Sequence, residues 1–167
     1  MISPLADLCR TALFSALLVT TAALPADAAD TTDVRPVGDG IVRVKSSYAF
    51  DETVERLKQD IAGKGILFFL AVDQAKLGAD AGVNVRPSTL LIFGNPPLGT
   101  QFITSNANAG LDWPVRLLVT QDERGAVWAV YTDFQWIAQR HGIRDRDPQF
   151  AMANKVVASI TSSVAPR

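Results

Sequence analysis

A glycine-spaced string follows an apolar run in the middle of the chain. Residues 90–93 read LLIF, and Gly94 to Thr100 then fit the outline G-x-x-x-x-G-T. A phosphate-binding loop has the form G-x-x-x-x-G-K-[ST], in which successive backbone N–H groups and the Lys hold the phosphates. Here Thr100 stands at the Lys position, and Pro96 and Pro97 have no N–H group to donate. The string therefore argues against a nucleotide site.

The same string admits two readings that involve no nucleotide. As a turn, Asn95 is kept out of helical geometry by the proline that follows it, and Gly94 and Gly99 permit positive φ angles. As a binding loop, the string follows a strand that ends at Phe93, and loops at strand ends commonly line ligand crevices in α/β proteins. Asn95 and Thr100 would then offer donors and acceptors to a small molecule. The sequence leaves both readings open.

Two carboxylates and one guanidinium are the other groups that could do chemistry. Asp73 and Asp112 each lie beside an apolar segment, so they could meet at one edge of a sheet and act as acid and base. Arg86 could hold a carboxylate or phosphate through two hydrogen bonds. Simpler roles compete, because Asp73 suits a helix N-cap, Asp112 a turn, and Arg86 an ion pair with either of them. The candidate ligand-binding residues are Asp73, Arg86, Phe93, Asn95, Thr100 and Asp112.

We expect neither a metal centre nor a cofactor. His141, the one histidine, follows Gln139-Arg140 and precedes Gly142, which indicates a helix C-terminus, where the helix dipole stabilises a cationic ring. One histidine without a cysteine cannot form a typical zinc site unless several carboxylates join it. No G-x-S-x-G string is present, so an α/β-hydrolase is unsupported. Whether the protein is an enzyme stays open at this point.

The first residues of the chain have the pattern of a secretory signal. Arg10 precedes an apolar run from Thr11 to Leu24, and Ala26-Asp27-Ala28 offers an A-x-A cleavage site. The run is shorter than the ~20 residues that a membrane-spanning helix needs. We therefore expect a signal peptide at 1–28 that is cleaved near Ala28. A flexible leader at 29–39 and a single domain at 40–165 would follow, in the periplasm or outside the cell.

Composition argues against several kinds of partner. Of the 167 residues, 48% are hydrophobic and 20% are charged, which is ordinary for a globular domain. Without residues 1–28, acidic and basic residues balance in number, and the one cysteine, Cys9, is lost. We expect no nucleic acid partner, because such binding usually leaves a basic patch. We also expect no disulfide, and the apolar run at 66–72 is too short to be a transmembrane segment.

Hydrophobic periodicity predicts an α+β fold, a single compact domain with helices packed on a mixed, largely antiparallel sheet. Residues 66–72 are continuously apolar, which favours a central strand that is covered on both faces. Residues 122–125 (DERG) indicate a hairpin turn between two antiparallel strands. The expected order is strand 41–45, helix 50–61, strand 66–72, helix 75–81, strand 89–93, loop 94–100, a helical or irregular segment at 102–106, strands 115–120 and 126–131, a helix that Asp133 caps, and a last helix that Asp147-Pro148 begins.

Several strings together form a family pattern. Residues 86–96 read RPSTLLIFGNP, and Gly99-Thr100, residues 111–114 (LDWP) and Tyr131 follow. Over about residues 40–163 the chain thereby resembles the bacterial family catalogued as domain of unknown function 302. The resemblance implies a compact α+β domain, often exported, that can form a homodimer, and it names no reaction.

Two positions depart from this family pattern. Gln74 stands where the pattern has a His after Asp73, so any role of that His in relatives is missing here. Trp113 stands where the pattern has Leu between Asp and Pro, and the larger ring could narrow a neighbouring pocket.

Three hypotheses about function follow. The first is a small-ligand binding or accessory module of the cell envelope with its site at the Gly94–Thr100 string. The second is an enzyme that uses Asp73 or Asp112 with Arg86 as an anion clamp. The third is a structural or interaction domain, such as a homodimer, in which the string only shapes an interface. We favour the first, because a polar string ends a strand in a chain without a recognised catalytic set.

Overall fold

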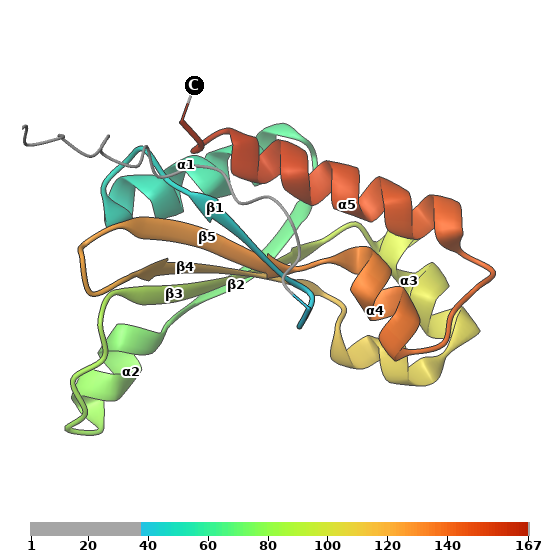
Figure 1. The fold of residues 1–167 in the computed structure, drawn as a ribbon, viewed down its shortest axis with the longest axis horizontal. Coiled ribbons are helices and arrows are strands. Elements are labelled where there is room, and N and C mark those ends of the chain that lie inside the picture. The colour runs from blue at the N-terminus through green and yellow to red at the C-terminus, as the bar shows by residue number, and fades with distance from the viewer. Residues whose placement is uncertain (1–37, 167) are drawn as a thin grey trace, which may run out of the picture.

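A computed structural model describes residues 38–166 of the chain (Figure 1). In order along the chain, the elements are β1 (Ile41–Lys45), α1 (Phe50–Gly63), β2 (Leu67–Asp73), α2 (Gln74–Asp80), β3 (Ser88–Gly94), α3 (Pro96–Ser105), the 3-10 helix η1 (Ala107–Leu111), β4 (Val115–Gln121), β5 (Val127–Thr132), α4 (Phe134–Arg140) and α5 (Asp147–Ser162). The predicted signal peptide and most of the predicted leader lie outside the described residues, so both stay predictions. Among residues 38–166, no helix has the length and hydrophobicity that a membrane crossing requires.

The strands form one antiparallel sheet in the order β1-β5-β4-β3-β2. A central row runs across it, in which Leu91 lies opposite Leu117, and Leu117 lies opposite Tyr131. Every strand pairing within the described residues is antiparallel. The predicted α+β fold with a largely antiparallel sheet is therefore confirmed, and the sheet of this domain contains no parallel pair within residues 38–166.

The core lies between one face of the sheet and the two long helices, α1 and α5, which lie side by side across that face (Figure 1). Leu57 and Ile61 of α1 are completely buried, as are Phe150 and Ile160 of α5. These residues belong to the helical stripes that the sequence predicts. Burial of each such side chain stabilises the fold by about 1.5–3 kcal/mol.

The strand β2 lies at the edge of the sheet, which corrects the prediction of a central strand. Leu67 and Leu70 are 52% and 46% exposed, and no residue of β2 is fully buried. A continuous apolar run is typical of a buried strand, but it does not encode the place of that strand in the sheet. The chain returns through α2 into β3, and β3 pairs with β4 on its other side, so β2 is left at the edge.

The Gly94–Thr100 string is mostly helix, which corrects the prediction of a loop at 94–100. Asn95 is the N-cap of α3, and Pro96 and Pro97 occupy its first positions. Proline is well suited to the first turn of a helix, because the N–H groups there have no partner within the helix. The residues that read as turn-formers in the sequence are thus the start of a helix that ends at Ser105.

The hairpin between β4 and β5 forms as predicted. The Asp122 carboxylate accepts hydrogen bonds from the N–H groups of Arg124 and Ala126, each at 2.9 Å, and from the Trp128 indole at 2.9 Å. Gly125 has a φ of 81°, which a glycine adopts without strain. The indole hydrogen bond is the main cause that lowers the pKa of Asp122 below its ordinary value.

The last two helices also begin as predicted. The Asp133 carboxylate accepts hydrogen bonds from the N–H groups of Gln135 and Trp136, at 2.8 and 3.0 Å, and Pro148 lies in the first turn of α5. The Asn154 side chain on α5 donates to Asp133 at 3.0 Å. This bond ties α4 to α5 and fixes the end of the sheet at which the site described below lies.

Tyr131 makes the stability of the fold depend on pH in the alkaline range. Its burial, and then the charge of Asp133, raise its pKa from 10.0 to about 12. A raised pKa means that the folded state favours the neutral phenol. The resulting contribution of Tyr131 to the free energy of unfolding is complete below pH 10 and is lost as the pH rises through about 12. We predict that Tyr131→Phe gains stability relative to the wild type over this window.

The measurement is urea unfolding of both proteins at several pH values between 8 and 12. Equal pH dependence of the two unfolding free energies would contradict the prediction.

Candidate functional site

The candidate residues of the sequence analysis lie at two ends of the sheet. Asp73 ends β2 and pairs with Thr89 near the start of β3, whereas Asp112 lies just before β4, whose first residue pairs with Phe93 near the end of β3. The strand β3 has seven residues, so its ends are about 20 Å apart at ~3.3 Å per residue. Asp112 is therefore remote from Asp73 and Arg86, and these three side chains do not form one acid–base site.

Asp73 and Arg86 both have structural partners. The Asp73 carboxylate caps α2, since it accepts a hydrogen bond from the Lys76 N–H at 2.8 Å. Arg86 forms an exposed ion pair with Glu123 at 3.4 Å, and not with Asp73 or Asp112. Gln74, which replaces the histidine of the family pattern, accepts a hydrogen bond from the Ser88 hydroxyl at 2.7 Å.

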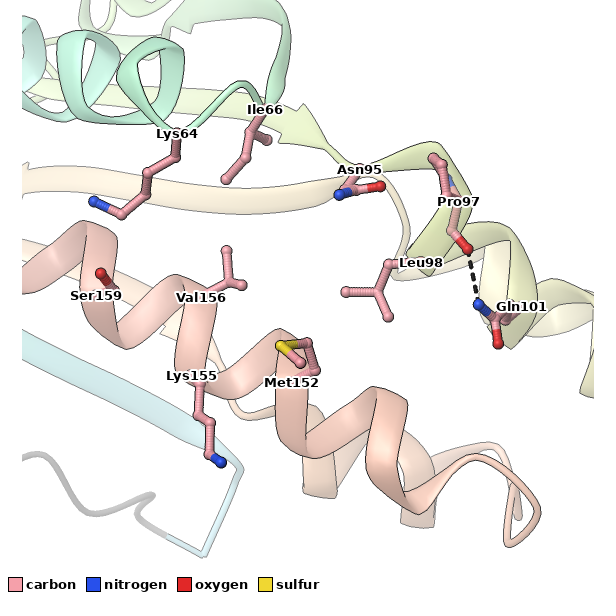
Figure 2. A pocket seen from close by; sticks show the side chains of 10 residues that line it. All are labelled: Lys64, Ile66, Asn95, Pro97, Leu98, Gln101, Met152, Lys155, Val156 and Ser159. Carbon is pink, nitrogen blue, oxygen red and sulfur yellow. Dashed lines mark hydrogen bonds between the residues drawn. The ribbon is translucent and has the colours of Figure 1, made fainter.

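A groove lies at the other end of the sheet, between the first turn of α3 and the middle of α5 (Figure 2). Its volume is about 510 Å³, within the range of small-molecule sites. It is lined by Lys64, Ile66, Asn95, Pro97, Leu98, Gln101, Met152, Lys155, Val156 and Ser159. Of the sequence-predicted residues, Asn95 belongs to this lining.

The groove has an apolar middle and polar ends. The Ile66, Leu98 and Val156 side chains face one another across it (Figure 2). At the α3 end, the Gln101 side-chain amide donates to the Pro97 carbonyl at 2.8 Å, which leaves its oxygen free to accept. Asn95 makes no capping hydrogen bond through its side chain within α3.

Lysines are the charged residues among the described lining. Lys64 extends along the groove toward Ser159, while the amino group of Lys155 points away from the centre of the groove (Figure 2). Lys64 also forms an ion pair with Asp60, one turn earlier on α1. An anion at this end would have to share the Lys64 ammonium group with Asp60.

A second, smaller space of about 30 Å³ lies beneath the groove. The two spaces share Ile66, Asn95, Leu98 and Val156, so these residues separate them. Among the described residues, the inner space is lined by glycines and apolar side chains apart from Asn95, and Phe93 and Trp113 belong to this lining. Phe93 is therefore a wall of this inner space and not of the groove.

The two glycines of the string are explained by the Trp113 ring. A Cβ atom on Gly99 would overlap the Trp113 indole, and one on Gly94 would lie 3.2 Å from the indole nitrogen. Neither glycine has the positive φ angle that the turn reading allowed. The G-x-x-x-x-G spacing thus makes room for an indole, and it does not form a phosphate cradle.

Thr100, the last residue of the string, makes a hydrogen bond within α3. Its hydroxyl donates to the Pro96 carbonyl within α3 at 2.7 Å, and the residue is exposed. Thr100 does not belong to the lining of either space. Asn95 and Phe93 are thus the candidates that the structure brings to this site, and Thr100 supports the helix beside it.

Asp112 is the centre of a buried ionic cluster that sequence reasoning missed. The carboxylate is 3% exposed, and it accepts hydrogen bonds from Arg116 at 2.7 Å and from Arg140 at 3.2 and 3.3 Å. The His141 Nε2 atom lies 2.6 Å from its second oxygen. These contacts attach the segment before β4 to the end of α4, and they compensate a carboxylate that would be costly to bury alone.

The sequence carried little signal for this cluster. Asp112 and Arg140 are separated by 28 positions, so no local periodicity joins them. The helix C-terminus predicted for His141 is correct, since it is the C-cap of α4, but its partner came only from the tertiary structure. Arg116 and Arg140 are about half exposed, and the outer side of the cluster is therefore basic.

The contact between Gly99 and Trp113 gives a direct test. We predict that Gly99→Ala destabilises the domain by about 1–3 kcal/mol, because the new methyl group overlaps the indole. In a Trp113→Leu background the same change should lower the free energy of unfolding by less. The coupling energy between the two substitutions should be about 0.5–3 kcal/mol. Urea unfolding of the four proteins measures this cycle.

Gly63→Ala is the matched control, since a methyl group there would meet no atom within 4 Å. An additive effect of the Gly99 and Trp113 changes would show that the two residues do not constrain each other.

Longer proteins with a related segment are known. The chain is 36% identical over 107 residues to "Fluoride-specific ion channel FluC 1" of Brucella suis biovar 1, covering 64% of this chain and 42% of that protein. The same identity relates it to "Fluoride-specific ion channel FluC 2" of Brucella melitensis biotype 1, covering 64% and 40%. The chain spans about two fifths of the length of these curated relatives, and their names describe those longer proteins.

The family follows from two further comparisons. The fold is similar to the crystal structure of an uncharacterized conserved DUF302 protein from Bacillus stearothermophilus, with a TM-score of 0.68, 18% identity, and coverage of 75% of this chain and 98% of that one. The family model described as "Domain of unknown function DUF302" matches residues 42–163, which include the string, the LDWP segment and Tyr131. This chain is a member of the DUF302 family.

Proposed function

We propose that this protein is a binding module that holds a small amphipathic anion in the groove between α3 and α5. The observation that carries the proposal is the composition of the groove, which combines an apolar middle with lysines and carboxamides at its rim. The groove of about 510 Å³ is large enough for such a molecule.

The apolar part of the ligand is argued from Ile66, Leu98 and Val156. These side chains lie in the middle of the groove, and Met152, also in the lining, is 54% exposed. An alkyl or aryl group that covers them would be stabilised by about 25 cal/mol per Å² of apolar surface removed from water. The groove therefore favours a ligand with a hydrocarbon portion over a sugar or a free amino acid.

The anionic part is argued from the charges at the rim. Within residues 38–166, the charged residues of the lining are Lys64 and Lys155, and no carboxylate belongs to it. Because the Lys155 amino group points away from the centre of the groove, the charge argument rests on Lys64 (Figure 2). The Asn95 amide NH2 group makes no capping bond within α3 and can donate hydrogen bonds to a carboxylate or phosphate group. Because Lys64 is shared with Asp60, we expect the charge to improve affinity less than the hydrocarbon part does.

Octanoate is a suitable first probe, with 1-octanol as its uncharged counterpart. We predict that octanoate raises the melting temperature of the domain and binds more tightly than octanol. A ligand that binds only the native state stabilises it by RT ln(1 + [L]/Kd), so a tenfold excess over Kd adds about 1.4 kcal/mol. Calorimetric titration then gives the Kd.

Met152→Glu should weaken octanoate binding by about tenfold, because it puts a carboxylate in the groove without disturbing the core. Leu77→Glu on α2 is the matched control, since Leu77 is 58% exposed and lies outside the groove. Equal octanoate affinity of the two variants, or no effect of octanoate on the wild type, would refute the groove as the site.

A second candidate function is that of an accessory domain of a membrane channel. It is favoured by the 36% identity to a segment of proteins named as fluoride-specific ion channels. In those relatives the related segment belongs to the same polypeptide as the rest of the protein.

Co-expression with a tagged fluoride channel tests this second candidate. We predict that the domain is retained with the tagged channel in detergent, while an unrelated domain of equal size is not. Elution of both domains in the unbound fraction would remove support for this function.

A further inference from the structure

The groove and the smaller inner space are neighbours that share part of their lining. Ile66, Leu98 and Val156 line both spaces, and each is only partly buried. A hydrocarbon chain that lies against these residues in the groove would therefore be next to the inner space. In the present arrangement the inner space has a volume of about 30 Å³, roughly the share of liquid volume that one water molecule occupies.

Trp113 is one of the large aromatic residues that line the inner space. The ring lines it together with Gly94 and Gly99, which it contacts, and α5 contributes Ala153, Val156 and Val157. Phe69 meets the indole edge to face, with the ring centroids 6.5 Å apart and the planes at 84°. The indole therefore contacts both α3 and β2.

We propose that Trp113 is the specificity-determining residue of the groove, and that it limits the length of the hydrocarbon tail of an amphipathic anion. A short tail lies in the outer groove against Leu98 and Val156. A longer tail would extend into the inner space, where the indole of Trp113 limits the room. This inference rests on the proposed function, since it concerns the same groove, and it adds the tail length as the property that the protein selects.

The experiment is a chain-length series of straight alkyl carboxylates from four to twelve carbons, each kept below its micelle-forming concentration. Affinities are measured by calorimetry for the wild type, Trp113→Leu and Trp113→Phe. Trp136→Leu is the matched control, because it removes the same number of atoms from a tryptophan outside both spaces. Thermal unfolding of each variant confirms that it is folded, and Trp113→Phe provides a milder change if Trp113→Leu is not.

We expect the wild-type affinity to rise by about fourfold per methylene group, as apolar burial predicts, and then to level off. In Trp113→Leu the rise should continue over at least two further methylene groups, so the longest tails bind about tenfold or more tightly than to the wild type. Trp113→Phe should fall between the two, and Trp136→Leu should follow the wild type.

The outcomes separate the two proposals. If the folded Trp113 variants bind alkyl carboxylates with the same chain-length profile as the wild type, the groove binds such ligands but Trp113 does not set the tail length. If no protein in the set binds any alkyl carboxylate, the proposed function fails, and this inference fails with it.

Discussion

The arrangement of this end of the domain depends on the Trp113 ring packed against two glycines. Gly94 ends β3 and Gly99 lies in α3, so the indole brings the strand and the helix together at one point. Any side chain at Gly99 would overlap the ring and move α3 relative to the sheet. The first turn of α3 forms one wall of the groove, and α5 forms the other. The shape of the groove is thus a consequence of how an indole is accommodated.

A second constraint acts at the same end through charge. Asp112 directly precedes Trp113 in the chain, and its buried carboxylate binds Arg116, Arg140 and His141. Breaking a buried ion pair by removal of one partner typically costs about 3–5 kcal/mol, because the remaining charge stays in a poorly solvating environment. The cluster therefore fixes the segment that carries Trp113 against α4, which Asn154 in turn connects to α5. Packing and electrostatics hold the same few elements.

Much of the fold could be predicted from the sequence, whereas the site could be predicted only in part. The stripes of α1 and α5 and the β4–β5 hairpin were correct, because periodicity and turn chemistry are local properties. The position of β2 was wrong, since its apolar run resembles that of a buried strand, yet pairing elsewhere leaves it at the edge. Asn95 was identified as a candidate from its place after the strand. Met152 and Val156 on α5, which form the opposite side of the groove, carried no signal because apolar helix residues look alike before they are packed.

The sequence by itself determined the elements, the family resemblance and the absence of a phosphate cradle, since Pro96 and Pro97 lack the N–H groups that phosphate binding needs. It also singled out the string from Gly94 to Thr100, although not the reason for its glycines. Only the tertiary structure shows why these positions are glycines. Trp113 is distant from Gly94 and Gly99 along the chain, and the antiparallel pairing of β3 with β4 brings its ring against them. The partners of Asp112 and the far wall of the groove were settled in the same way. Contacts between segments that are remote in sequence have no periodic signature, and they form only when the sheet and the helices pack.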